Sequence, residues 1–128
     1  MAYGLVYTFP EELAKGTFNF STHTFKAAFY TAALDAATVT AYSATNEVSG
    51  GSYSAGGATA TLTLSRSSNV TTLSMSDLVI TVPQACVSWM LYDVSASNKA
   101  VLVAPLTGVS GAGSLTVRWN VPLLTLTV

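Results

Sequence analysis

The chain has 128 residues and a formal net charge of −1, and only 9% of its residues are charged. A chain of this length is expected to form one domain, spanning residues 1–128, with a core of its own. It has no basic stripe and no apolar run of about 18 residues, so its composition argues against nucleic-acid binding and against a membrane-spanning helix. Because ordinary soluble proteins contain roughly 25% charged residues, we expect much of this surface to be covered by neighbouring subunits in an assembly.

A short helix is predicted near the N-terminus, over residues 8–16. Thr8 and Glu11 have the spacing of a capping box. Pro10 is tolerated in the first turn, because its missing N–H would be unpaired there anyway. Gly16 can end the helix in the left-handed conformation. At about two turns, the helix needs packing against the rest of the chain to be stable.

Apolar and polar side chains then alternate in five segments: residues 18–21, 25–30, 59–65, 115–120 and 124–128. This period of two predicts half-buried antiparallel strands with a threonine-rich outer face. Residues 78–82 and 86–92 are apolar on both faces and are predicted to be central strands, with Cys86 and Trp89 in the core. Short strands separated by turn signals predict an all-β fold: an antiparallel β-sandwich, jelly-roll or immunoglobulin-like, with one short N-terminal helix.

Residues that support catalysis or metal binding are scarce. The single histidine, His23, lies in a Ser/Thr-rich segment and is expected to be a polar turn residue. No Gly-x-Ser-x-Gly elbow surrounds any serine, so we expect no catalytic residues and no enzyme. One histidine and one cysteine cannot build a typical zinc site, and the spacing of a calcium loop is missing. We therefore expect no metal site and no cofactor.

A glycine-rich loop covers residues 49–57. A phosphate-binding loop would need a lysine and a following helix, whereas residues 58–65 alternate like a strand. Two interpretations remain open. The loop could be a flexible connection between strands, or an arm that contacts a neighbour through Tyr53. Tyrosine suits the second role because it offers a large contact area and a hydroxyl at low entropic cost.

Three segments share a pattern with known proteins. The first contains the Glu-Leu pair of the helix, residues 16–20 and residues 24–31. The second is Thr-Asn-Glu-Val-Ser-Gly at residues 45–50, followed by a tyrosine and a Gly-Gly pair. The third combines residues 91–93 with residues 98–101. Together they resemble a family of small virion proteins of tailed bacteriophages that includes head decoration, or cement, proteins. Relatives tend to read Glu-Val-x-Gly-x-Gly-Tyr, whereas this chain has Ser52 in place of the second glycine.

The resemblance implies a virion component on the capsid surface without enzymatic activity. It would be a decoration protein that binds the outer face of the major capsid lattice and stabilises it by multivalent surface contacts. Its expected partners are the major capsid protein and copies of itself, as a trimer, with no nucleic acid and no membrane. We expect the contacts in residues 2–9 and 49–57. The interface residues of this hypothesis are Tyr3, Leu5, Tyr7, Phe9, Glu47, Gly50, Gly51, Tyr53, Gly56 and Gly57.

Two other functions remain open. A β-sandwich could serve equally well as a tail, baseplate or fibre component, and the copy number per virion would distinguish these positions from head decoration. The chain could also be a carbohydrate or host-surface binding module that uses exposed aromatic residues such as Tyr42, Tyr53 and Trp89. Because Trp89 lies in a strongly apolar strand, it is expected in the core instead.

Overall fold

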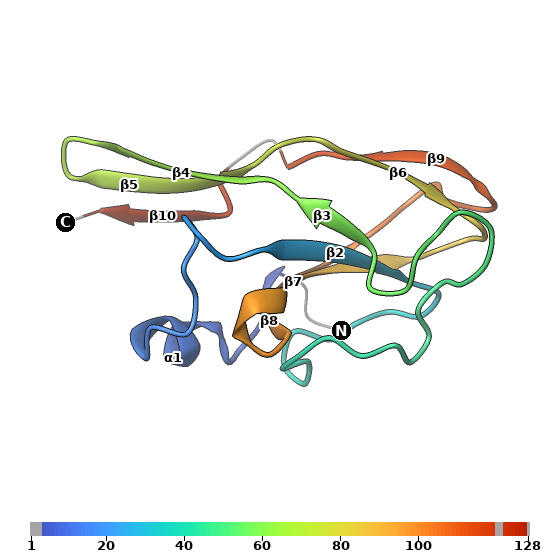
Figure 1. The fold of residues 1–128 in the computed structure, drawn as a ribbon, viewed down its shortest axis with the longest axis horizontal. Helices are drawn as coiled ribbons and strands as arrows, with labels where there is room; N and C mark the ends of the chain where they lie inside the picture. Colours follow the sequence, from blue (N-terminus) through green and yellow to red (C-terminus); the bar gives the residue numbers. More distant parts are fainter. Residues whose placement is uncertain (1–3, 120–121, 128) are drawn as a thin grey trace.

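The computed structural model describes residues 4–119 and 122–127, and they form a mostly β, sandwich-like fold (Figure 1). The prediction of an antiparallel all-β fold with one short α-helix is confirmed. In chain order, the elements of the described residues are β1 (Gly4–Leu5), α1 (Phe9–Ala14), β2 (Phe25–Tyr30), β3 (Ala58–Ala60), β4 (Leu62–Ser67), β5 (Val70–Met75), β6 (Leu78–Val82), β7 (Ser88–Asp93), the 3₁₀ helix η1 (Val94–Ala96), β8 (Lys99–Pro105), β9 (Gly113–Val117) and β10 (Leu124–Thr127).

The strands form two layers. The first is a five-stranded sheet in the order β1-β8-β7-β2-β3. The second contains a three-stranded sheet, β10-β5-β4, and a two-stranded sheet, β6-β9. All the strand pairs are antiparallel. In Figure 1 these two smaller sheets follow one another along the upper layer, because β5 continues almost directly into β6.

The core is built around β7, which lies between β2 and β8 and is buried along its whole length. Phe29 of β2 pairs with Trp89 of β7, and both side chains are buried. Cys86 is buried as well, so the two core positions predicted in residues 86–92 are confirmed. Residues 78–82 form a strand, β6, as predicted, but its predicted central position is wrong. Among the described residues β6 pairs with β9 alone, and the side chain of Val79 is 65% exposed because no described segment covers its outer face.

The helix α1 is present but shorter than predicted, and its capping box does not form. Thr8 makes no side-chain capping bond, and the carboxylate of Glu11 instead pairs with Lys15 at 2.7 Å. Gly16 adopts a left-handed conformation with φ of 78°, as predicted for the end of the helix.

Residues 18–21 are not a strand, so the alternation was misleading there. Phe18 and Phe20 instead stack in a row between Phe9 of the helix and Phe25 of β2. The ring centroids are 5.3 Å apart for Phe9 and Phe18, 5.8 Å for Phe18 and Phe20, and 5.2 Å for Phe20 and Phe25. Aromatic packing of this kind stabilises the fold beyond the area that it buries. The row therefore fastens the helix to the start of β2.

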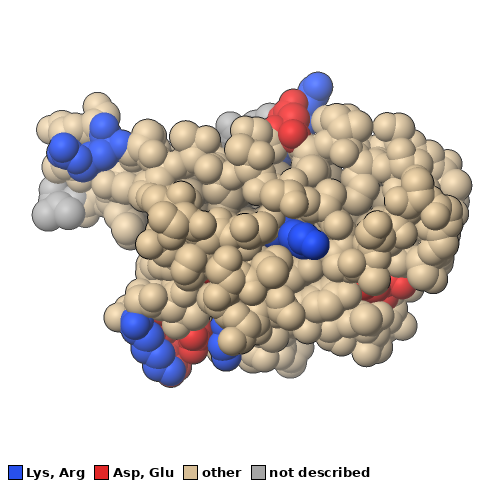
Figure 2. All heavy atoms as spheres, in the orientation of Figure 1, with Lys and Arg blue, Asp and Glu red and all other residues tan. Residues whose placement is uncertain are grey.

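The sheet of β4, β5 and β10 projects beyond the rest of the molecule, and we call it the arm (residues 62–75 and 124–127; Figures 1 and 2). Its register places Leu64, Leu73 and Leu124 side by side on one face. Leu73 is 1% exposed, but Leu64 and Leu126 are 47% and 48% exposed. The apolar face of the arm therefore starts in the core and continues, uncovered, towards the tip.

Candidate functional site

The expected N-terminal interface residues lie in different surroundings. Leu5 is partly buried in β1, where it pairs with Leu102 of β8. Phe9 is buried in the aromatic row, so its assignment as a contact residue is corrected. Tyr7 is 68% exposed and can contact another molecule. Tyr3 lies outside the described residues.

The expected loop interface is organised by one carboxylate. Glu47 accepts hydrogen bonds from the Tyr42 hydroxyl at 2.6 Å, the Tyr53 hydroxyl at 2.6 Å and the Gly56 N–H at 2.8 Å. The Tyr92 hydroxyl donates to the Gly56 carbonyl at 2.6 Å, and its ring stacks on that of Tyr42 at 4.8 Å. We call these five residues the Glu47 cluster. It holds the polar loop against β2 and β7, so the loop is folded onto the body.

Tyr53 cannot be the exposed contact residue that was predicted. Its side chain is 8% exposed, and its hydroxyl oxygen also accepts the Phe29 N–H at 3.1 Å. Gly56 is buried as well. Only Gly50 and Gly51 of the expected loop residues lie in an exposed turn, so this region offers mainly backbone to a partner.

Gly57 explains why the loop can approach the sheet. It has a φ of 85°, and a Cβ atom there would lie 1.8 Å from the Ala27 carbonyl oxygen of β2. Only glycine fits such a close backbone approach. The sequence placed Gly57 among the contact residues, whereas the structure uses it to bring the loop and β2 together.

Burial raises the pKa of Tyr53 and of Tyr42 above the usual tyrosine value, and their hydrogen bonds to Glu47 raise each pKa further. Burial also raises the pKa of Tyr30, whose hydroxyl donates to the Ser43 carbonyl at 2.7 Å. These hydroxyls therefore stay protonated at neutral pH and act as fixed donors. The arrangement stabilises a loop, and nothing in it prepares a tyrosine to react.

His23 lies in a turn, as predicted, but it has a partner that the sequence did not indicate. Its Nδ1 lies 2.6 Å from Oδ2 of Asp93, a fully buried carboxylate at the end of β7. The other oxygen of Asp93 accepts the Ser95 N–H at 2.9 Å. These contacts tie the turn before β2 to the end of β7. The partners are 70 residues apart, so no local pattern could have paired them.

No group of three or more histidine, cysteine, aspartate or glutamate side chains that could hold a metal ion occurs in residues 4–119 and 122–127. Within the same ranges, every helix is too short and too polar to cross a membrane.

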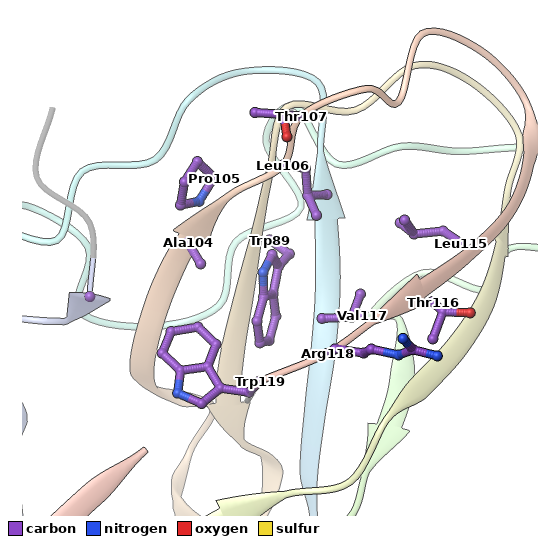
Figure 3. Close-up of a pocket in the computed structure, with 11 residues that line it drawn as sticks. Trp89, Ala104, Pro105, Leu106, Thr107, Leu115, Thr116, Val117, Arg118 and Trp119 are labelled. Atoms are coloured by element: carbon purple, nitrogen blue, oxygen red, sulfur yellow. The ribbon is translucent and has the colours of Figure 1, made fainter. Parts of the chain in front are cut away.

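A groove of about 570 Å³ lies between the end of β8 and β9 (Figure 3). Trp89 and Trp119 meet edge to face there, with ring centroids 6.1 Å apart. The Nε1 atom of Trp119 is buried and has no hydrogen-bond acceptor in the described part of the chain. Arg118 lines the groove and donates to Asp77 at 3.1 Å. The sequence predicted Trp119 only as an inward residue of a strand, so it gave no signal for a groove.

The exposed surface carries few charges. Figure 2 shows broad uncharged areas between a few charged side chains, some of which lie beside a side chain of opposite charge. The arm contains a single charged residue, Arg66. Its side chain donates to the Ser68 carbonyl at 3.1 Å, at the turn between β4 and β5. The arm thus combines exposed leucines, hydroxyl groups and almost no charge.

Comparison of the sequence and the fold with known protein families, curated proteins and solved structures finds no match.

Proposed function

We propose that this chain is a structural protein of a tailed-bacteriophage head that decorates the capsid surface. The observation that supports this proposal best is the arm, which projects from the body and exposes apolar side chains with one charge. An uncharged projecting surface is costly to leave in water and well suited to contact with other subunits. The resemblance of residues 45–50 and the neighbouring segments to phage virion proteins supports the same assignment.

In this function the chain stabilises the shell by many repeated contacts. Its partners are the major capsid protein and further copies of the chain, which form a trimer. Each contact can be weak, because a shell holds many copies at fixed positions and so raises the effective concentration of each partner. The contact surface differs from the one predicted from the sequence: Tyr7, the exposed turn at Gly50 and Gly51, and the arm take part, whereas Phe9 and Tyr53 do not.

The experiment is a reconstitution on phage heads that lack the protein. Purified chain is added to bare heads, binding is measured by co-sedimentation, and the temperature at which the heads release DNA is compared with and without the chain. We expect saturable binding and a higher release temperature. Heads that neither bind the chain nor gain stability would overturn the proposal. A protein found only in tails would place it among tail, baseplate or fibre components.

The groove at Trp119 favours a second candidate function, binding of a carbohydrate. An indole ring can pack against the apolar face of a sugar, and a sugar hydroxyl that reaches the buried N–H of Trp119 would supply the acceptor that it lacks. The residues first considered for this role fit it less well, because Trp89 and Tyr53 are buried and Tyr42 belongs to the Glu47 cluster.

A glycan array with the purified chain tests the second candidate. For any glycan that binds, Trp119→Phe should weaken binding by roughly tenfold, because it removes one hydrogen-bond donor and keeps an aromatic ring. Tyr7→Phe is the control, since it removes a hydroxyl from an exposed residue outside the groove. An array without any bound glycan would eliminate this function.

A further inference from the structure

The strand β10 is an outer strand of the arm with an open hydrogen-bonding edge. One edge of β10 pairs with β5 over its whole length, from Leu124 to Thr127. The other edge faces no strand among the residues that the structure describes. Three of its four residues are exposed. The outward N–H and C=O groups of β10 are therefore available to another strand.

This edge has one feature that natural proteins use to limit pairing, a length of only four residues, but it lacks the others. Those others are charged side chains, proline, a bulge or a covering segment. The four residues of β10 include neither a charge nor a proline, and its register with β5 has no bulge. The opposite edge of the arm, β4, differs because it carries Arg66. Of the two edges, β10 is thus the one prepared for a partner strand.

The side chains of β10 also suit pairing with an identical strand. Leu124 and Leu126 lie on the apolar face, in line with Leu73 and Thr71 of β5, while Thr125 and Thr127 lie on the hydroxyl-rich face. Because the strand is uncharged, two copies can approach without electrostatic repulsion. An antiparallel pair around a two-fold axis brings the same surface from both copies together, which is the commonest symmetry of protein dimers.

We propose that β10 pairs with β10 of a second copy of this chain, antiparallel across a two-fold axis, so that two arms join into one continuous sheet. Residues directly opposite each other in an antiparallel pair point to the same face. The register centred on Thr125 satisfies this rule. It sets Leu124 opposite Leu126 of the partner subunit and Thr125 opposite Thr125 of the partner subunit, so both apolar faces align.

The pairing is expected to be weak in dilute solution. A strand of four residues contributes far less than the about 800 Å² per partner that a stable interface usually buries. Copies held close together on a shell would pair much more readily. In this respect the inference rests on the proposed function: the arms would then join neighbouring decoration trimers across local two-fold positions of the capsid lattice.

Disulfide trapping tests the pairing, because it captures a transient dimer. In the proposed register, the Cα atoms of Thr125 and its symmetry mate lie about 4.5–5.5 Å apart, a separation that a disulfide can span. Under mild oxidation, we expect Thr125→Cys to accumulate as a covalent dimer. Ser65→Cys, at an exposed position of β4, is the control and should stay mostly monomeric. The natural Cys86 is buried and should not interfere.

A second variant separates specific pairing from random collision. Leu126→Lys in the Thr125→Cys background places two like charges at the paired edge, so the yield of dimer should fall by roughly tenfold. Leu126 is half exposed, so this change should leave the arm folded, which circular dichroism verifies. Equal dimer yields for Thr125→Cys and Ser65→Cys would overturn the proposal. Cross-linking of Thr125→Cys mainly to Ser65→Cys would also overturn it, by showing that β10 pairs with β4 of a neighbour.

The two experiments distinguish a failure of the strand pairing from a failure of the decoration function. Chain that stabilises heads but does not cross-link at residue 125 would leave the decoration function standing and remove the strand pairing. Chain that cross-links at residue 125 but does not bind heads would leave the pairing standing and remove the decoration function.

Discussion

The loop around Glu47 and the arm show opposite relations between sequence pattern and exposure. The loop is polar and glycine-rich, yet one carboxylate with two tyrosine hydroxyls folds it onto the body and buries Tyr53. The arm alternates regularly between apolar and polar residues, yet its apolar face runs past the core and leaves Leu64 and Leu126 half exposed. A period of two thus shows which side chains share a face, but it does not show how far a covering layer extends.

Gly57→Ala should have the largest effect on the loop. The new Cβ would meet the Ala27 carbonyl oxygen, which belongs to the backbone of β2 and cannot move aside, and the residue has a φ of 85°. We expect a loss of about 3 kcal/mol or more in the free energy of unfolding, measured by urea denaturation. Gly111→Ala is the matched control, because beyond its chain neighbours no described atom lies within 4 Å of its added Cβ. Equal stability of the two variants would refute the tight approach of the loop to β2.

Leu73→Ala and Leu64→Ala test the arm at two neighbouring positions of the same face. Leu73 is fully buried, so its truncation should cost about 2–5 kcal/mol in the free energy of unfolding. Leu64 is half exposed, and its truncation should cost about 1 kcal/mol or less. Thermal or chemical denaturation of both variants measures the difference. Similar losses would mean that another segment covers Leu64 in the isolated chain.

Glu47→Gln tests the electrostatic part of the Glu47 cluster. The amide group can accept only on one side, so either the Tyr42 hydroxyl loses its acceptor, or the Tyr53 hydroxyl and the Gly56 N–H lose theirs together. We expect a loss of about 2 kcal/mol in the free energy of unfolding and faster proteolysis within residues 49–57. Glu11→Gln is the control, because this exposed carboxylate pairs with Lys15 on the surface. A loop that stays protease-resistant in Glu47→Gln would contradict the assigned role.

The pH dependence of stability gives the smallest and most specific signal. The pKa of Tyr53 in the folded chain lies above its usual value of 10.0, because of burial and its bond to Glu47. Above a pH of about 10 the unfolded chain loses this proton first, so the free energy of unfolding falls as the pH rises. In Tyr53→Phe the free energy of unfolding should fall less steeply with pH, by up to about 1.4 kcal/mol per pH unit. Tyr7→Phe, outside the cluster, serves as control, and identical slopes in both variants would contradict the prediction.

A regular apolar pattern predicted strands correctly where both faces are buried, at residues 25–30 and 86–92, and also where one face is exposed, within residues 115–120 and 124–128. The core positions of Trp89 and Cys86 follow the same rule. Residues 18–21 broke it, because an extended connection between ring contacts can also place alternate side chains on one side. The central position expected for residues 78–82 failed because hydrophobicity alone does not show how many strands lie alongside.

The candidate contacts could be predicted less well, because they depend on which residues meet in space. The contact of His23 with Asp93 and the row that joins Phe9 to Phe25 link distant parts of the chain. The Glu47 cluster was within reach of the sequence: a lone acid between Tyr42 and Tyr53 can accept from both hydroxyls. The proposed partner strand lies on a second molecule, so no pattern within one chain could reveal it.

The β4-β5 hairpin of the arm joins the body through two very short junctions, and this has a mechanical consequence. Thr61 separates β3 from β4, and Ser76 and Asp77 separate β5 from β6. The Ser76 N–H donates to the Thr61 carbonyl at 3.0 Å, so the two crossings are clamped together. The arm is therefore expected to be rigid and to keep a fixed angle to the body. Copies of the chain that are joined through rigid arms would favour one curvature of the shell. A shell of a different radius would have to bend the arms.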